Sequence, residues 1–499
     1  MVPNDVHQKR ITVVGAGLAG SECALQLAEL GYEVDLFEMR SLSAQVMTEA
    51  HKTEKFAELV CSNSFGSLSE GSAPAQLKWE AQALGSFILK AAVEAQVPAG
   101  QALGVDREVF SQLVSTMVRN QSRIKIHQNL VLSLDQIPRP AVIATGPLTH
   151  PKFAESLQAH FGDEFLYFFD AIAPILDTDS IDMEIAWKAD RYDKGSADYI
   201  NCPLDKQQYD NLILEIQNAR KIEPKNFEST QFFEGCMPIE TMVARGPETL
   251  RFGPMKPVGL RHPRTGREMH AIVQLRQDNR EATAYNMVGF QTRMAYGEQT
   301  RVFRMIPGLE KVEFLKLGSI HRNLFINTPK RLNKDLSSQK DPWLFFAGQI
   351  TGVEGYFEST TIGLLVARFM DQKIRKPAAE PANFPPRDSM TGALLESITD
   401  VTRADHFQPT NVNFGLFTDL KDENGKKIRD KKTKKSRQIA RAQAQFTEWV
   451  GSQNWKMPEN FLGLRFMVEP PTAPMLRSPI SVPVPLNSAE LSSKAPANP

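Results

Sequence analysis

Residues 11–40 read ITVVGAGLAGSECALQLAELGYEVDLFEMR, and they are the part of the chain that says most about its fold. The β-branched run 11–14 predicts a buried first strand. Gly15, Gly17 and Gly20 then form G-x-G-x-x-G at the point where the strand should give way to a helix. Glycines at this spacing allow a tight turn, the approach of a pyrophosphate to the backbone, and close packing of the helix on the strand. The stretch therefore predicts a Rossmann-like unit that binds a dinucleotide.

An acidic residue ends the next predicted strand. Residues 34–37 restart an apolar run after the helix, and Glu38 closes it. A carboxylate at this position accepts hydrogen bonds from a ribose, which suits NAD or the adenosine half of FAD and argues against a 2′-phosphate. A lone glycine motif is a weak signal, but both strands, the helix and the acid occur here in order.

Two later segments favour FAD. Residues 141–146, AVIATG, are typical of a strand at which a sheet returns to the same dinucleotide. Residues 343–365, WLFFAGQITGVEGYFESTTIGLL, predict a second strand, a glycine-rich loop and a helix that starts near Ser359 or Thr360. A helix N-terminus that points at a flavin ring stabilises its reduced, anionic form. Either segment alone is as well explained by an ordinary turn at a sheet edge, and Tyr356 either stacks on a flavin or fills the core. The predicted cofactor-binding residues are Gly15, Ala16, Gly17, Leu18, Ala19, Gly20, Glu38, Arg40, Gly146, Gly348, Gln349, Gly352, Glu354, Gly355 and Tyr356.

Composition limits the class of protein. The chain has 499 residues, 41% hydrophobic and 23% charged, which predicts a globular protein of two or three domains. No apolar run is long enough for a transmembrane helix, and the N-terminus lacks a signal-peptide core, so we expect a cytoplasmic protein. The net charge is zero, so any nucleic-acid surface must be local. Four scattered cysteines without a CxxC predict neither a disulfide framework nor a metal site.

The predicted fold class is α/β: a Rossmann-like FAD-binding domain with an inserted α+β domain and a helical C-terminal segment. Strand-like AIVQL at 271–275 lies in the insertion. The boundaries that follow are a discontinuous FAD-binding domain over 1–155 and 310–375, an inserted domain over 156–309, a linker and basic helical region over 376–460, and a Pro-rich, disordered tail over 461–499.

Two of the four cysteines have the setting of reactive residues. Cys236 lies on a turn in FFEGCMPIET, where Glu234 and Glu240 are candidates to take or relay protons. Cys61 lies in ELVCSNSFGS, where Ser62, Asn63 and Ser64 are candidate hydrogen-bond donors to a thiolate. A cysteine is more often a small buried hydrophobe, and we interpret Cys23 and Cys202 in that way. For Cys61 and Cys236 the two interpretations are evenly matched on the residues alone.

A basic run precedes a predicted helix that reaches Trp449. Eight Lys and Arg residues lie between 426 and 437. Such a run is more often a solvated face than an RNA site unless another feature points to RNA. The four candidates for phosphate contacts are Lys431, Lys432, Lys434 and Lys435.

Many motifs, in order, resemble one family. They are GAGLAG, FAELVCSNS, PAGQALGVDRE, NCPL, FEGCMPIE, GPMKPVGL, YNMVGFQT, LGSIHRNLFIN, GQITGVEGY and NFGLF. They are similar to the TrmFO family of folate- and FAD-dependent tRNA (uracil-5-)-methyltransferases, which are GidA-like flavoproteins, over about residues 9–450. Gly66 stands where the family usually has a basic residue, and Gln101 replaces a usual glycine.

The resemblance implies methylation of C5 of the T-loop uridine of tRNA, forming ribothymidine. Methylenetetrahydrofolate would be the carbon donor, reduced FAD the electron donor, and NADPH or NADH the reductant of the flavin. Because C5 of uracil is a poor nucleophile, a thiolate must first add to C6. The family pattern places that nucleophile at Cys236 and gives Cys61 a supporting role, as a base or as a protector of the flavin-bound carbon.

Two alternatives remain. One is the related flavoprotein that modifies the wobble uridine of tRNA, which is longer and has a C-terminal organisation not found here. The other is a flavin-containing RNA-binding protein without catalysis. The oligomeric state does not follow from the sequence.

Overall fold

The structure is a computed structural model. It describes residues 10–48, 50–162, 166–193, 196–222, 237–375, 383–420 and 428–453. Cys236 and the tail predicted over 461–499 lie outside the described residues.

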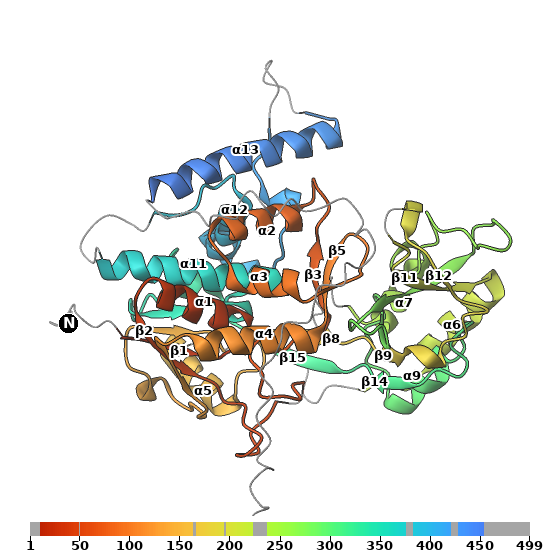
Figure 1. Cartoon of the computed structure of the whole chain (residues 1–499), viewed down its shortest axis with the longest axis horizontal. Coiled ribbons are helices and arrows are strands. Elements are labelled where there is room, and N and C mark those ends of the chain that lie inside the picture. The colour runs from red at the N-terminus through yellow and green to blue at the C-terminus, as the bar shows by residue number, and fades with distance from the viewer. Residues whose placement is uncertain are drawn as a thin grey trace, which may run out of the picture. The chain divides into compact units, whose positions relative to one another are not determined.

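The glycine-rich motif begins a five-stranded parallel sheet with the strand order β16-β7-β1-β2-β6 (Figure 1). Val14 at the end of β1 pairs with Phe37 of β2 on one side and with Ile143 of β7 on the other, and Phe346 of β16 pairs with Ile143. The carboxyl ends of these strands therefore meet at one edge of the sheet. The strands are β1 (Arg10–Val14), β2 (Glu33–Phe37), β6 (Ile124–His127), β7 (Ala141–Ile143) and β16 (Leu344–Phe346).

Helices α1 and α11 pack against each other beside this sheet, and both follow glycine-rich loops (Figure 1). The predicted start of α11 near Ser359 or Thr360 is wrong, because the helix begins at Tyr356. Gly355 has φ +105°, so the loop ends in the left-handed region and the helix starts at the next residue. The helices of this part of the chain are α1 (Leu18–Glu29), α2 (Ala73–Ala83), α3 (Phe87–Glu94), α4 (Arg107–Asn120), α5 (Pro151–Phe161), α10 (Thr328–Arg331), α11 (Tyr356–Arg375) and α12 (Met390–Thr399).

Residues between β7 and β16 form a second sheet of six antiparallel strands in the order β10-β11-β12-β13-β9-β14. Its strands are β9 (Ile175–Asp177), β10 (Trp187–Lys188), β11 (Tyr199–Leu204), β12 (Ala271–Gln277), β13 (Ala284–Met287) and β14 (Phe314–Lys316). The helices of this segment are α6 (Lys206–Asn218), α7 (Ile239–Arg245), α8 (Thr249–Phe252) and α9 (Tyr296–Phe303). The strand predicted at 271–275 is confirmed as part of β12.

The remaining strands form two short sheets. One pairs β3 (Ser64–Ser67), β5 (Ala102–Val105) and β4 (Gln96–Val97), and the other pairs β8 (Leu166–Ala171) with β15 (Ile320–Phe325).

Buried hydrophobic side chains form two large clusters. The first is drawn from residues 11–161 and 324–450, and the second from residues 176–312. The α/β, Rossmann-like fold class is therefore confirmed. We propose that the two clusters are the cores of two domains, the first of which is interrupted in sequence by the second; the boundaries near residues 155 and 310 stay predictions.

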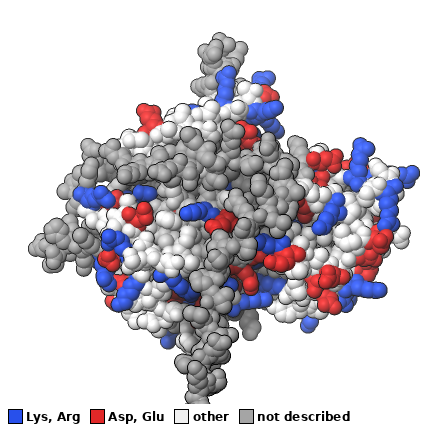
Figure 2. Space-filling view, in the orientation of Figure 1, with Lys and Arg blue, Asp and Glu red and all other residues white. Residues whose placement is uncertain are grey.

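The C-terminal helix is α13, Lys431–Ser452. It begins inside the basic run rather than after it, since the Asp430 side chain accepts a hydrogen bond from the Thr433 amide and caps the helix there. Within the described residues, we find no helix with the length and apolar character needed to cross a membrane. Figure 2 shows basic and acidic side chains interspersed over the face in view, as the zero net charge suggests.

Candidate flavin cavity and cysteine site

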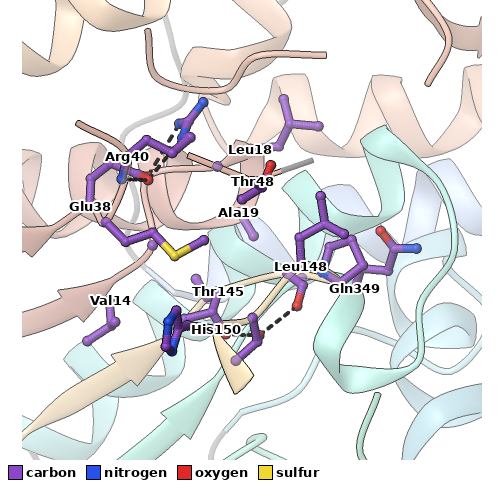
Figure 3. A pocket seen from close by; sticks show the side chains of 18 of the residues that line it. Val14, Leu18, Ala19, Glu38, Arg40, Thr48, Thr145, Leu148, His150 and Gln349 are labelled. Atoms are coloured by element: carbon purple, nitrogen blue, oxygen red, sulfur yellow. Dashed lines mark hydrogen bonds and ion pairs between the residues drawn. The ribbon is translucent and has the colours of Figure 1, made fainter. Parts of the chain in front are cut away.

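A cavity lies at the edge of the parallel sheet where its strands end. Its lining comes from the loops after β1, β2, β6, β7 and β16 and from the start of α11, segments that are far apart in the sequence (Figure 3). Crevices outside the carboxyl ends of parallel strands are the usual ligand sites of such sheets. The parallel register therefore assembles the cavity.

The first glycines of the motif shape one wall of this cavity. Gly15 has φ +101°, and a Cβ there would lie 2.5 Å from the carbonyl O of Ala144, so a side chain is excluded. Gly17 precedes the first turn of α1, and a Cβ there would meet no atom within 4 Å. The space in front of Gly17 therefore faces the amide groups of a helix N-terminus, which is the setting that binds a pyrophosphate.

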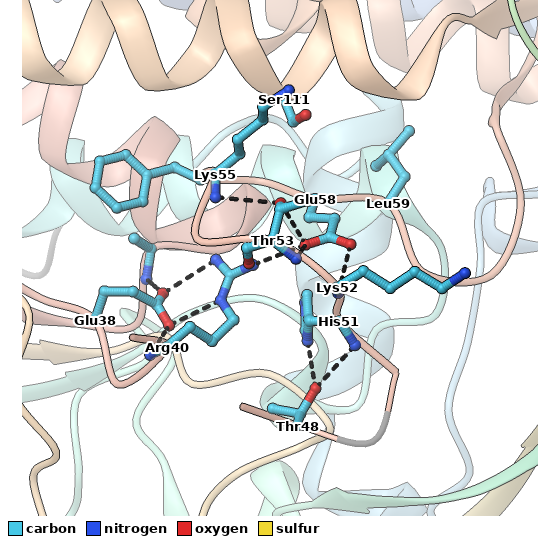
Figure 4. A network of polar contacts seen from close by, with 12 residues as sticks. Glu38, Arg40, Thr48, His51, Lys52, Thr53, Lys55, Glu58, Leu59 and Ser111 are labelled. Carbon is cyan, nitrogen blue, oxygen red and sulfur yellow. Dashed lines mark hydrogen bonds and ion pairs between the residues drawn. The ribbon is translucent and has the colours of Figure 1, made fainter. Parts of the chain in front are cut away.

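Glu38 lines the cavity in an ionised state. Its carboxylate accepts hydrogen bonds from the Ala16 amide at 2.9 Å and from Arg40 Nε at 2.9 Å (Figure 4). Burial alone would raise the pKa of the Glu38 carboxyl, but Arg40 and the two backbone amides hold it below the ordinary value. This carboxylate accepts four hydrogen bonds, from the Ala16 and Arg40 amides and from Nε and Nη2 of Arg40, so a ribose hydroxyl would share or replace one of these contacts.

The loop between residues 48 and 58 adds cavity-lining groups that the sequence did not predict. Glu58 accepts hydrogen bonds from the Lys52 and Thr53 amides, and Arg40 Nη1 lies 3.5 Å from Glu58 (Figure 4). Thr48 Oγ1 lies 2.6 Å from Nδ1 of His51, and burial lowers the pKa of His51 to about 4. The one signal in the sequence is that polar residues are frequent in this loop, and such a pattern does not distinguish a cavity-lining network from an ordinary surface loop.

Ten of the fifteen predicted cofactor residues line the cavity: Gly15, Gly17, Leu18, Ala19, Glu38, Arg40, Gly146, Gly348, Gln349 and Tyr356. The other five are not among the lining residues: Ala16, Gly20, Gly352, Glu354 and Gly355.

These five have close neighbours within the protein instead; for Gly352 and Gly355, an added Cβ would meet Phe407 and Glu358. The Ala16 amide donates to Glu38, and a Cβ on Gly20 would overlap the carbonyl O of Gly15. Glu354 accepts a hydrogen bond from Nε2 of Gln349 at 2.9 Å. Lining residues that were not predicted include Thr145, His150 and the segment 129–131. The segment 129–131 follows β6, and only the parallel register brings it to this edge.

Cys61 lies next to the cavity in a segment without regular secondary structure. The hydroxyl oxygen of Tyr356, a cavity residue, accepts hydrogen bonds from the amides of Cys61 at 2.8 Å and of Ser62 at 3.1 Å. Burial raises the pKa of Tyr356, so this hydroxyl stays protonated. The Cys61 Sγ lies 4.0 Å from the carbonyl O of Ala171.

The residues expected to donate to the Cys61 sulfur bind other groups instead. Ser62 Oγ accepts from Arg276, and Asn63 Nδ2 donates to the carbonyl oxygens of Val105 and Gln277. Ser64 Oγ accepts from the Gly66 amide. The expected contacts to the sulfur are not found, because each of these side chains is engaged elsewhere: Asn63 links two distant strands, Ser62 binds Arg276, and Ser64 binds the amide two residues on.

The structure describes some of the remaining candidate residues around the cysteines and not others. Cys236 and Glu234 lie outside the described residues. Glu240, four positions after Cys236, is buried, accepts hydrogen bonds from Thr292 and the Arg293 amide, and has its pKa raised by burial. Cys23 and Cys202 are confirmed as buried residues, and burial raises the pKa of both thiols.

The four candidate RNA-binding lysines all lie in the first turns of α13. Lys431, Lys432 and Lys435 are exposed, whereas Lys434 forms an ion pair with Asp419 at 2.8 Å. Lys435 Nζ also lies 5.0 Å from the centroid of the Phe414 ring.

Comparison with known proteins identifies relatives over most of the chain. A family model described as "Glucose inhibited division protein A" matches residues 10–378. A protein of Bdellovibrio bacteriovorus named methylenetetrahydrofolate--tRNA-(uracil-5-)-methyltransferase TrmFO is 70% identical, covering 89% of this chain and 99% of the relative. A protein of the same name from Natranaerobius thermophilus is 49% identical, covering 88% of this chain and 99% of the relative.

Solved structures show a similar fold. The form II crystal structure of Aquifex aeolicus GidA has a TM-score of 0.61 and 17% sequence identity, and the match covers 91% of this chain and 75% of that one. At this identity the likeness concerns the fold alone. Because the family model covers more than half of the chain and full-length relatives reach 70% identity, the chain belongs to the glucose inhibited division protein A family and, within it, to the TrmFO methyltransferases.

Proposed function

We propose that this chain is a methylenetetrahydrofolate--tRNA-(uracil-5-)-methyltransferase that methylates C5 of the T-loop uridine. One structural observation carries the proposal. Tyr356 lines the dinucleotide cavity and holds the backbone of Cys61, so one residue joins a cofactor cavity to a cysteine segment. The 70% identical relative has this activity in its name, and this chain covers 99% of that relative.

The cavity has the features that FAD requires. The open space in front of Gly17 would take the pyrophosphate, and Glu38 would accept hydrogen bonds from the ribose. Tyr356 and Ser359 at the start of α11 line the same cavity and would bring a helix N-terminus to the flavin. Reduced FAD, when bound, supplies the hydride that turns the transferred one-carbon unit into a methyl group.

The protein groups would act on the uracil ring. We propose that the Cys236 thiolate adds to C6, which makes C5 nucleophilic enough to bond to the methylene carbon of the folate. A base must then remove the proton from C5 as tetrahydrofolate leaves, which gives an exocyclic methylene on C5. Addition of a hydride to that methylene, which reduced FAD would supply, forms the methyl group and expels the cysteine from C6, restoring the ring. Cys61 would serve at the same site, as that base or as a protector of the flavin-bound carbon, and either role suits its position beside the cavity.

The substrate surface and the reductant are further proposals. Three exposed lysines in the first turns of α13 would contact tRNA phosphates, a source of sequence-independent affinity. NADPH or NADH would reduce the flavin. A cytoplasmic location remains the prediction made from the sequence.

A tRNA that carries 5-fluorouridine in the T-loop tests the nucleophile. Fluorine at C5 does not leave as a proton does, so the adduct at C6 persists as a covalent protein–RNA band. The band is expected with the wild-type protein and with Cys202→Ser as the matched control, and it should be absent with Cys236→Ser. A Cys236→Ser protein that still cross-links would exclude Cys236 and make Cys61 the first candidate.

A T-loop methylation assay with labelled methylenetetrahydrofolate separates the alternatives. Label in the T-loop uridine supports the proposal. Label at the wobble position, or flavin and tRNA binding with no label transfer, would favour the wobble-uridine enzyme or the non-catalytic binding protein respectively.

A further inference from the structure

The backbone of residues 59–61 is held by cationic side chains from other parts of the fold. Arg107 Nη1 donates to the carbonyl O of Leu59 at 3.0 Å, and its Nη2 donates to that of Cys61 at 3.2 Å. Lys316 Nζ donates to the carbonyl O of Val60, between them, at 3.2 Å. Three consecutive carbonyl groups of a segment without secondary structure therefore bind two cations.

Arg107 is itself firmly placed. It is the first residue of α4, and Asp278, just after β12, accepts hydrogen bonds from its Nε at 3.2 Å and its Nη2 at 3.1 Å. Only 15% of the Arg107 side chain is exposed. A paired, buried guanidinium loses little entropy when it binds two further carbonyl groups, so it is a rigid support for the segment.

Lys316 differs from Arg107, because its ammonium group forms no ion pair with any described carboxylate. It lies at the end of β14, and burial lowers its pKa, with Arg107 and Lys52 lowering it further. A thiolate at Cys61 and, after it, the carboxylate of Glu58 act in the opposite direction and raise the pKa of Lys316, so both groups are close enough to interact with it. Its hydrogen bond to the Val60 carbonyl does not cancel the positive charge, so the ammonium can act on a negative charge at the neighbouring sulfur.

A third cation reinforces the charge around Cys61. Arg276 donates to Ser62 Oγ at 3.2 Å and to Asn63 Oδ1 at 3.1 Å, in the two residues that follow Cys61. The nearby carboxylate of Asp278 is already paired with Arg107. Among the groups that contact residues 59–63, positive charge therefore exceeds negative charge.

We propose that Lys316, together with Arg107, is a positioning residue that fixes the backbone of Cys61 and keeps its sulfur in a positive electrostatic environment. The cysteine segment would then favour an anionic reaction partner or a developing negative charge on the substrate. This inference rests on the proposed function for its catalytic meaning, but its physical content can be tested without methyl transfer.

The test compares two alkylating reagents on the purified flavoprotein. Iodoacetate is an anion and iodoacetamide is neutral, and both modify the same sulfur, so the ratio of their rates at Cys61 reports the local field. Peptide mass spectrometry separates Cys61 from the other cysteines. By Coulomb's law, loss of a unit charge roughly 4–6 Å from a reacting anion in a water-like dielectric changes a rate by about three- to fivefold. Lys316→Met is therefore expected to lower the iodoacetate-to-iodoacetamide ratio by about threefold or more.

Matched variants make the result specific. Lys311→Met removes an exposed lysine five positions earlier and should leave the ratio unchanged, and Lys316→Arg should restore it. In the methylation assay Lys316→Met should lower kcat with less than a twofold change in KM for tRNA. An unchanged ratio in Lys316→Met, an equal change in both rates, or a wild-type Cys61 that reacts with neither reagent would overturn the proposal. Failure of methylation in the wild-type protein, with the ratio behaving as expected, would instead reject the proposed function.

Discussion

Valine at Gly17 is expected to abolish FAD binding without harming the fold. Gly17 has φ −75° and ψ −164°, an extended conformation that valine adopts readily, and an added Cβ meets no atom within 4 Å. The new side chain would instead project into the space that a pyrophosphate needs. Because Gly17 is the N-cap of α1, where valine is less favourable than glycine, the free energy of unfolding of the apo protein should fall by about 1 kcal/mol at most.

The loss of affinity can be worked out from the helix end. The first amides of α1 have no partner within the helix and would donate to phosphate oxygens. A hydrogen bond to a charged group contributes about 1.5–3 kcal/mol. If the valine side chain keeps the pyrophosphate from two of these amides, the loss is about 3–6 kcal/mol, which weakens the Kd for FAD by about 10²–10⁴-fold.

The assay is titration of apo protein with FAD, followed by the change in flavin fluorescence, with thermal unfolding of each variant. Gly297→Val is the matched control, because a Cβ there also meets no atom within 4 Å but lies on α9, away from the cavity. Gly20→Val should instead destabilise the fold, since its Cβ would overlap the carbonyl O of Gly15. A Gly17→Val protein that binds FAD within threefold of wild type would refute the placement of the pyrophosphate.

Two further predictions concern the C-terminal helix and His51. Alanine at the four α13 lysines should weaken tRNA binding and leave flavin reduction unaffected. In binding assays at several salt concentrations, the log–log slope of affinity against salt should fall by about 0.9 for each phosphate group that the variant no longer binds. An unchanged slope would mean that these lysines only face solvent and do not bind tRNA. Because the pKa of His51 is about 4 in the folded protein and 6.5 ordinarily, the unfolded chain binds a proton first as the pH falls, so the free energy of unfolding of the apo protein should decrease from pH 6.5 to 4. Urea unfolding across this range should show a smaller decrease for His51→Gln, and an identical decrease in both proteins would contradict the assignment. The lysines are Lys431, Lys432, Lys434 and Lys435.

Much of the parallel sheet and its cofactor cavity could be predicted from local patterns in the amino-acid sequence. The run 11–40 contains a strand, a glycine turn, a helix and an acid in order, and each of these depends on residues that are neighbours in sequence. The structure has β1, α1 and β2 where the pattern placed them, with Glu38 directly after β2. The predicted start of α11 is about one turn too late, because the left-handed conformation of Gly355 is not evident from its residue type.

The cofactor class, the order of the main elements and the family follow from the amino-acid sequence, because glycine spacing, strand and helix periodicity and motif order are local properties of the chain. The surroundings of Cys61, in contrast, depend on tertiary packing. Tyr356 and Arg107 contact Cys61 from 295 and 46 residues away in sequence, and Lys316 contacts the preceding Val60 from 256 residues away. Such contacts follow from how sheets and helices pack, and no local pattern encodes which distant side chain meets a given backbone carbonyl. For the same reason, Ser62 and Asn63, which stand beside Cys61 in sequence, bind Arg276 instead.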